Sequence, residues 1–243
     1  MSATNRTSGQ RNISDLYETP PWVVDRFLDY FEQEGNDLLP GGRWLEPGAG
    51  SGAIIRAVNN RRNDVRWSAV EILPELEKDL RPVCEDVYIG DFLGMSVDRF
   101  GGEQFKVALG NPPYSLAWDF VQRSMRLAEQ TAVLLRLNFW ESAERREFLA
   151  EYPPDTFVLP QRPCFALNKH GKPGSDATAY AWFLFQSYDY YDLNRPTAGH
   201  IRVLGETPAL ERKAWLDHLR EEGRRLGLSL SESSSPSSAA VDP

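Results

Sequence analysis

Residues 43–52 read Arg-Trp-Leu-Glu-Pro-Gly-Ala-Gly-Ser-Gly, a short apolar run that leads into a glycine-rich loop. Residues 53–60 follow with the apolar spacing of an amphipathic helix. Glycine has no Cβ, so such a loop can turn sharply and bring its backbone close to a ligand. The same chemistry also makes ordinary tight turns, so the loop alone is weak evidence of a ligand. The stretch predicts a strand, a tight turn and a helix, which is the unit of an α/β fold.

The same alternation of apolar runs and helical patterns extends on both sides of the loop. Strands are expected at residues 43–46, 66–72, 87–90, 105–110, 131–138, 156–159 and 179–186. Helices are expected at residues 53–60, 74–80, 116–129, 142–152 and 207–226. A further helix is expected to begin at Thr19-Pro20-Pro21, in the same way as at Thr207-Pro208, with a threonine N-cap and a proline in the first turn. This alternation predicts right-handed βαβ units and a mostly parallel sheet, in which ligands bind beyond the carboxyl ends of the strands.

Length and composition indicate one globular domain. The chain of 243 residues is 41% hydrophobic and 26% charged, which excludes wholesale disorder. Residues 1–14 are expected to be a flexible polar arm, residues 15–228 a single domain, and residues 229–243 a serine-rich disordered tail. No apolar run approaches the roughly 20 residues of a membrane helix, and the start has no secretory signal. Two cysteines are too few for a disulfide framework, so a cytoplasmic protein without a membrane partner is expected.

The net charge of −8 argues against a nucleic-acid partner, because phosphate contacts need clustered lysine and arginine. The distribution of charge weakens that argument. Arg162, Lys169 and Lys172 lie in a stretch that contains no acidic residue. A locally basic face on an acidic protein is therefore compatible with the sequence.

Acidic residues follow three successive predicted strands. Glu46 would repel a pyrophosphate and better suits a cation, such as the amino group of methionine. Glu71 can accept hydrogen bonds from ribose hydroxyls, with Ile72 beside it to cover an adenine, or it can simply begin a helix. Asp91 can accept from an adenine amine while Phe92 stacks on the ring, or Asp91 can cap a helix above a core Phe92. The complete series favours a cofactor that carries both an amino acid and a nucleoside.

The fourth predicted strand runs directly into Asn111-Pro112-Pro113-Tyr114. The side-chain oxygen of Asn111 and the carbonyl of Pro112 can each accept one hydrogen of a planar amine. This favours a pyramidal nitrogen whose lone pair can attack. The prolines stiffen the turn, and Tyr114 offers a flat face to an aromatic base. Asparagine and proline are also common turn residues, so a purely structural turn is the alternative.

These motifs together resemble the amino-methyltransferase superfamily, especially the DNA adenine-N6 methyltransferases. Asn-Pro-Pro-Tyr follows Glu-Pro-Gly-Ala-Gly-Ser-Gly, and Glu18-Thr19-Pro20 resembles the N-terminal cofactor motif of the subgroup with that order. The resemblance spans roughly residues 17–186. It implies a Rossmann-like sheet of seven mostly parallel strands with helices on both faces and an antiparallel last strand. It also implies direct methyl transfer from S-adenosylmethionine to adenine N6 in DNA, on a flipped base and without a metal.

The resemblance also implies which residues form the site. The cofactor would contact Thr19, Glu46, Pro47, Gly48, Gly50, Glu71, Ile72, Asp91, Phe92 and Asn111. The catalytic residues would be Asn111, Pro112, Pro113 and Tyr114, and the acceptor would contact Tyr114, Arg162, Phe165, Lys169 and Lys172.

The segment Arg162-Pro163-Cys164-Phe165 resembles the late loop of adenine-N6 enzymes, in which an aromatic residue packs against the flipped base. Phe165 is the candidate for that contact, and a core position is its structural alternative. Cys164 is interpreted as a packing residue, because the nucleophilic cysteine of cytosine-C5 methyltransferases follows the fourth strand instead. The basic loop 168–176 is the candidate for sequence readout, or a plain hairpin loop. His170, His200 and His218 have no metal-ligand spacing.

The acceptor remains open among relatives that carry this tetrapeptide. Some act on adenine in DNA, some on adenine or guanine amines in RNA, and some on a glutamine of translation release factors. DNA is favoured by the Glu-Thr-Pro motif and the late loop. Only about 57 residues follow Gln186, too few for a large recognition domain, so a partner subunit or the short target sites of solitary, phage-like enzymes would have to supply specificity. A catalytically silent cofactor-binding subunit is the alternative from another class.

Overall fold

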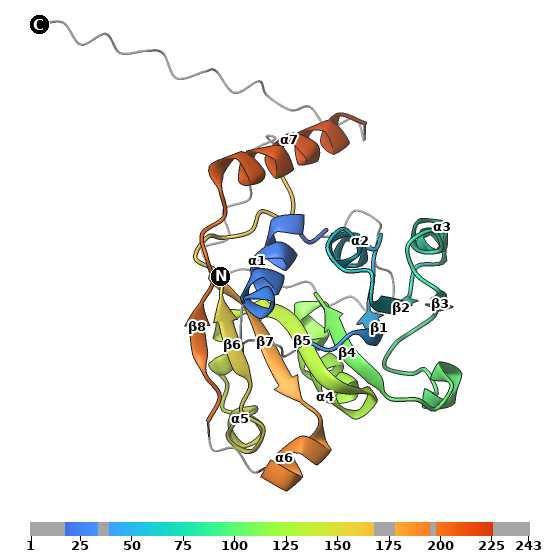
Figure 1. The fold of residues 1–243 in the computed structure, drawn as a ribbon, viewed down its shortest axis with the longest axis vertical. Helices are drawn as coiled ribbons and strands as arrows, with labels where there is room; N and C mark the ends of the chain where they lie inside the picture. Colours follow the sequence, from blue (N-terminus) through green and yellow to red (C-terminus); the bar gives the residue numbers. More distant parts are fainter. Residues whose placement is uncertain (1–17, 34–38, 168–177, 195–197, 226–243) are drawn as a thin grey trace, which may run out of the picture.

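The computed structural model describes residues 18–33, 39–167, 178–194 and 198–225. Eight strands form one sheet in the order β3-β2-β1-β4-β5-β7-β6-β8, from one edge of the sheet to the other (Figure 1). The strands are β1 (Gly42–Pro47), β2 (Val65–Glu71), β3 (Asp86–Ile89), β4 (Phe105–Gly110), β5 (Ala128–Arg136), β6 (Asp155–Val158), β7 (Tyr180–Gln186) and β8 (Ile201–Val203). The helices are α1 (Pro21–Glu32), α2 (Ala53–Asn59), α3 (Glu77–Leu80), α4 (Ala117–Leu127), α5 (Arg146–Glu151), α6 (Tyr188–Asn194) and α7 (Ala209–Arg225).

The strand pairing confirms the predicted Rossmann-like sheet. Strands β3, β2, β1, β4 and β5 are parallel, whereas β7 runs antiparallel between β5 and β6. Strand β8 pairs in parallel with β6 and makes the count eight rather than the expected seven. It escaped prediction because it has three residues and lies at the sheet edge, where Ile201 and Val203 are 69% and 70% exposed. So short a strand shows no clear alternation of buried and exposed residues.

Helices cover both faces, as predicted, and side chains alternate between them along the central strands. In β7, Trp182 and Leu184 pack on the face covered by α1, α2 and α7, whereas Phe183 and Phe185 pack on the face of α4, α5 and α6. Trp182 stacks on Phe27 at 4.9 Å between ring centroids. Burial on both faces explains why these strands are continuously apolar.

Several predicted helix boundaries differ from the structure, and the helix expected at residues 142–152 is an α-helix only over Arg146–Glu151. The helix expected to reach residue 129 ends at Leu127, because Ala128 begins β5 and pairs with Phe105 of β4. The N-cap of α1 is Pro20 rather than Thr19, and no side chain in the described ranges caps this helix. Tertiary contacts of these residues override their local preferences.

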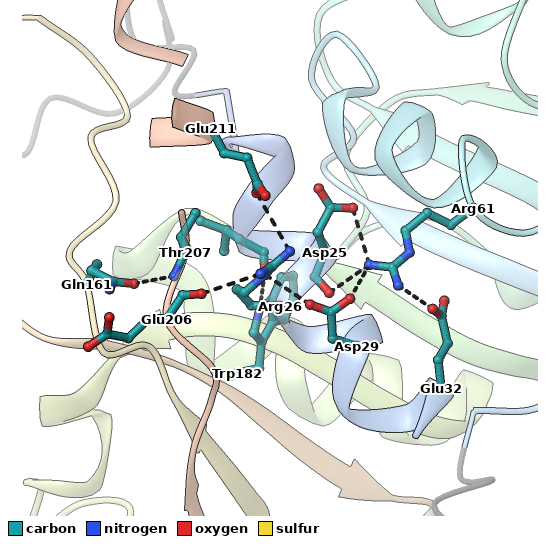
Figure 2. A network of polar contacts seen from close by, with 11 residues as sticks. Asp25, Arg26, Asp29, Glu32, Arg61, Gln161, Trp182, Glu206, Thr207 and Glu211 are labelled. Carbon is teal, nitrogen blue, oxygen red and sulfur yellow. Dashed lines mark hydrogen bonds and ion pairs between the residues drawn. The ribbon is translucent and has the colours of Figure 1, made fainter. Parts of the chain in front are cut away.

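Helix α7 begins at Ala209, two residues later than predicted, and the Thr207 hydroxyl has no hydrogen-bond partner among the described residues. The backbone N–H of Thr207 instead donates to Gln161 Oε1 at 2.9 Å. Arg26 of α1 lies beside this segment, 3.6 Å from a carboxylate oxygen of Glu211 and 3.0 Å from that of Asp29 (Figure 2). The ion pair between Arg26 and Glu211 attaches the start of α7 to α1.

Candidate active site at the carboxyl edge of the sheet

The glycine loop after β1 is held by the carboxylate of Glu71 at the end of β2. Glu71 Oε2 accepts from the Gly50 N–H at 2.7 Å, and Oε1 accepts from the N–H groups of Ile72 and Leu73 at 2.8 and 2.9 Å. Gly48, Gly50 and Gly52 have φ values of 73°, 54° and 83°, in the left-handed region that favours glycine. Glu71 therefore holds the loop in its conformation. This structural role is additional to the ribose contact predicted for Glu71.

Glu46 is buried beneath this loop with an open acceptor. It is 2% exposed, and its Oε2 has no hydrogen-bond partner in the described part of the chain. Burial raises the pKa of Glu46 well above its ordinary value, as does Glu71 to a lesser degree, while the Ile55 N–H and Arg56 act in the opposite direction. A buried carboxyl with one free oxygen fits a positively charged ligand, because a cation would offset the desolvation of the ionised form.

The segment before α1 connects the glycine loop with the Asn-Pro-Pro-Tyr turn. Ser51 Oγ of the loop donates a hydrogen bond to Glu18 Oε1. The next residue, Thr19, is 3% exposed, and its Oγ1 accepts from Asn111 Nδ2 at 3.1 Å. Since the amide nitrogen of Asn111 is engaged by Thr19, its amide oxygen remains as an acceptor. Glu18 and Thr19 thus link the glycine loop to the Asn-Pro-Pro-Tyr turn.

The turn lies directly beside the loop because β4 is the neighbour of β1. The two strands pair at Leu45 with Ala108, and a Cβ on Gly110 would lie 3.4 Å from the carbonyl oxygen of Pro47. A side chain at position 110 would therefore crowd the start of the glycine loop. Of the turn itself, Pro112 is buried, whereas Asn111, Pro113 and Tyr114 are half-buried.

Three aromatic rings meet next to the turn. The centroid of Tyr180 lies 5.9 Å from that of Tyr114 and 5.2 Å from that of Phe165. The Arg136 guanidinium lies 5.2 Å from the centroid of the Tyr114 ring. Phe165 thus lies near the turn through Tyr180, and it also packs, partly buried, against the core on this face of the sheet. Arg162 is exposed, whereas Lys169 and Lys172 lie outside the described residues.

The segment after β3 matches the structural alternative for Phe92. This side chain is 3% exposed and packs against Phe120 at 5.0 Å between ring centroids. Asp91 is exposed, and its Oδ1 accepts from the Leu93 N–H at 3.0 Å. Ile72 is 48% exposed and is the apolar side chain that remains open at this edge. The structure therefore offers Asp91 and Ile72 to a ligand, with Phe92 beneath them in the core.

Helix α7 contributes contacts that the sequence did not predict. Trp215 Nε1 donates to the Cys164 carbonyl oxygen at 2.6 Å, in the loop that carries Phe165. His218 Nε2 lies 3.8 Å from Glu18 Oε2. The surface packing expected for α7 therefore includes both the late loop and the segment before α1. The local signal was a buried tryptophan in a charged helix, but nothing near it in sequence indicates its partner.

The described ranges contain neither a metal-binding cluster nor a membrane-spanning helix. No group of three or more histidine, cysteine or acidic side chains is arranged to hold a metal ion there. Among the same residues no helix has the length and apolarity to cross a bilayer.

Comparisons with known proteins place this geometry in a wider context. No family model matches the chain. A type II methyltransferase from Thermus thermophilus is 35% identical over 114 residues, which are 46% of this chain and 24% of that protein. The chain therefore spans about a quarter of the length of this curated relative. A Pyrococcus horikoshii protein, described as an RNA methyltransferase, superposes on 74% of this chain and 91% of its own, with 14% identity and a TM-score of 0.52.

The chain has a methyltransferase fold. A magnesium protoporphyrin IX methyltransferase from Synechocystis with bound S-adenosylmethionine is also similar, with 12% identity, 69% of this chain and 79% of that chain covered, and a TM-score of 0.46. S-adenosylmethionine is the cofactor that this methyltransferase fold implies for the chain.

Proposed function

We propose that this protein transfers the methyl group of S-adenosylmethionine to the exocyclic N6 amine of adenine in DNA. The observation that carries the proposal is the link through Glu18 and Thr19. The first residue bonds Ser51 of the glycine loop, and the second bonds Asn111 of the Asn-Pro-Pro-Tyr turn. Methyl transfer requires donor and acceptor sites to be neighbours, because catalysis by orientation depends on near-contact of the reacting atoms.

Residues of the glycine loop and its surroundings fit the cofactor. The free oxygen of buried Glu46 would face its ammonium group. The unused lone pairs of Glu71 would accept from its ribose, and Ile72 and Asp91 would contact its adenine. When bound, the cofactor supplies an electrophilic methyl group on a sulfonium.

The turn after β4 fits a planar amine. Asn111 Oδ1 and the Pro112 carbonyl would each accept one amine hydrogen, which concentrates the lone pair of the nitrogen toward the methyl donor. Thr19 fixes the orientation of the Asn111 amide by accepting from Nδ2. Tyr114 would stack on the base, and Phe165, which like Tyr114 packs against Tyr180, would line the same pocket. Extrusion of the adenine from a duplex costs a few kcal/mol, and stacking on Tyr114 would offset part of it.

DNA is the proposed acceptor for two reasons. The Glu-Thr-Pro segment makes the contacts described above, and it resembles the N-terminal cofactor motif of the DNA subgroup. The relative with 35% identity is a type II methyltransferase. An RNA amine, a release-factor glutamine and a silent cofactor-binding subunit are the competing outcomes.

The test is incubation of the protein with methyl-labelled S-adenosylmethionine and, separately, duplex DNA, RNA and release-factor protein. Label recovered as N6-methyladenine from DNA supports the proposal, and label confined to RNA or protein overturns it. The matched control is Asn111→Ala, which should abolish transfer and retain cofactor affinity. Cofactor binding by the wild type without transfer to any acceptor would indicate the silent subunit instead.

A further inference from the structure

A cavity of about 450 Å³ opens beside the Asn-Pro-Pro-Tyr turn, and the proposed reaction does not use it. Its walls come from the turn and the first residues of α4, from the end of β5, and from the segment between β5 and α5. The lining includes Tyr114, Trp118, Arg136, Asn138 and Arg145. Ligand pockets commonly enclose about 300 to 1,000 Å³, so the cavity has the size for a small molecule or a nucleotide.

Arg145 is a half-buried cation in the wall of this cavity. Burial lowers the pKa of its guanidinium, and the nearby carboxylate of Glu144 raises it by less. Its Nε donates to the Phe139 carbonyl at 3.0 Å, and its guanidinium lies 4.4 Å from the Phe139 ring centroid. Within the described residues, Arg145 forms no salt bridge. A partly desolvated guanidinium in a fixed position gains from an anionic partner, and phosphate is the anion that suits it geometrically.

The remaining walls suit a polynucleotide strand. Arg136 also lines the cavity and lies over the Tyr114 ring, so a second guanidinium adjoins the proposed base pocket. Trp118 packs edge-on against Phe148 at 4.7 Å between ring centroids and is half-buried. Arginines interleaved with aromatic faces are typical of sites that track a nucleic-acid backbone and stack its bases. Asp119 and Glu144 also line the cavity; they are exposed, as is Arg136, so water screens all three charges, and half-buried Arg145 is the least screened charge of this wall.

We propose that this cavity binds the nucleotide that adjoins the methylated adenosine in the same strand. Its phosphate would contact Arg145 and Arg136, and its base would lie against Trp118. The inference rests on the proposed function. If an adenine stacks on Tyr114, the next nucleotide of the same strand must lie within one nucleotide length of that ring. A flanking-nucleotide site would add strand affinity next to the proposed base pocket.

The test measures binding of a fluorescein-labelled oligonucleotide by anisotropy across a salt series, with S-adenosylhomocysteine present. The variants are Arg145→Gln, Arg145→Lys, Arg136→Gln and Arg146→Gln. Arg146 is the matched control, because it is the exposed neighbour of Arg145 and lies outside the cavity wall. Melting temperatures of all four variants establish that each is folded.

Arg145→Gln and Arg136→Gln should each weaken binding about tenfold. Each should also reduce the slope of log affinity against log salt by about 0.7 to 0.9, as expected for one lost phosphate contact. Arg145→Lys should keep the slope, since it keeps the charge, and Arg146→Gln should keep both quantities. Equal affinity and slope for Arg145→Gln and Arg146→Gln would overturn the cavity assignment while DNA methylation by the wild type still stands. Failure of the wild type to bind or methylate DNA would instead remove the proposed function, and the inference with it.

Discussion

Single hydroxyl and carboxyl groups hold the two halves of the candidate site in register. The Asn111 side chain bonds Thr19, 92 residues earlier in the chain, and Glu18 bonds Ser51. Thr19 was predicted as a cofactor contact, and the structure adds a contact with the proposed catalytic amide. Its hydroxyl is buried, so the bond to Asn111 is protected from competition by water.

Thr19→Val tests this positioning role. Valine keeps the shape of threonine but leaves Asn111 Nδ2 without its partner, which costs about 1–3 kcal/mol in a buried setting. We expect kcat for methyl transfer to fall about tenfold or more, with a smaller change in cofactor affinity. Thr19→Ser restores the hydroxyl and should restore most of kcat. Equal losses in the valine and serine variants would show that packing matters rather than the hydrogen bond.

We expect Glu46 to make stability and cofactor affinity change in opposite directions as the pH rises. Because burial raises its pKa in the folded state, the folded protein retains a proton that the unfolded chain loses near the ordinary value of 4.5. The free energy of unfolding should therefore fall as pH rises above that value toward the pKa of the folded state. Glu46→Gln lacks this fall, so urea denaturation of both cofactor-free proteins across a pH series should show a widening difference. If the difference in the free energy of unfolding were the same at every pH, it would contradict a buried Glu46 carboxyl that keeps its proton.

The same residue governs the pH dependence of cofactor affinity. An ammonium group beside Glu46 favours its ionised form, so cofactor affinity of the wild type should rise with pH across that window. Glu46→Gln should bind more weakly and lose this dependence. Isothermal titration with S-adenosylhomocysteine measures both effects, and unchanged affinity in the variant would exclude Glu46 from the cofactor site.

At the level of elements, α7 links regions that a surface helix would not be expected to join. Its start is attached to Arg26 of α1, and Trp215 bonds the carbonyl of Cys164 in the late loop (Figure 2 shows the first of these contacts). His218 completes the set by approaching Glu18. The helix thereby supports the loop that carries Phe165 from one side and the segment before α1 from the other.

Trp215→Phe removes the hydrogen bond to the late loop and keeps an aromatic ring. We expect a several-fold increase in KM for DNA, because the position of Phe165 is less well defined, with little change in cofactor affinity. Trp140→Phe is the control, since Trp140 Nε1 donates to Thr156 Oγ1 at 3.2 Å on the other face of the sheet. An equal effect of both substitutions on KM would argue for a general loss of stability.

At the level of the whole molecule, both faces of one sheet are buried and Trp182 lies at the junction of the sheet with α1. It is fully buried, stacks on Phe27, and donates from Nε1 to the Val23 carbonyl at 3.0 Å. The packing of Trp182 against α1 also positions Glu18 and Thr19 in the candidate site, because α1 follows directly after these two residues. Stability of the core and geometry of the site are therefore coupled through α1.

Trp182→Ala should reduce the free energy of unfolding by about 3–5 kcal/mol, through loss of buried area and creation of a cavity. Val203→Ala at the exposed edge strand β8 should change it by less than about 0.5 kcal/mol. Denaturant unfolding curves for the two variants give the comparison. Similar losses in both would mean that β8 contributes to the core far more than its exposure suggests.

Patterns among near neighbours were enough to predict most of this fold. The glycine loop, the continuous apolar strands and the proline-stiffened turn are each encoded within about ten residues, so their order along the chain predicted a Rossmann-like sheet with the loop and turn at one edge. Such patterns did not predict the boundary of α4, the absence of N-caps at Thr19 and Thr207, or the three-residue strand β8. In each of them a distant partner, rather than local preference, determines the conformation.

Contacts between distant residues account for everything that chain order could not predict about the site. Thr19 meets Asn111 across 92 residues, and Trp215 meets Cys164 across 51, while the cavity wall joins α4, β5 and the segment before α5. Such contacts form only after the sheet has brought the partners together. The hydrophobic periodicity of the sequence does not indicate which residues will be partners. Residue types alone therefore indicated the chemistry of a methyl transfer, and packing of the folded chain assembled the place where it can occur.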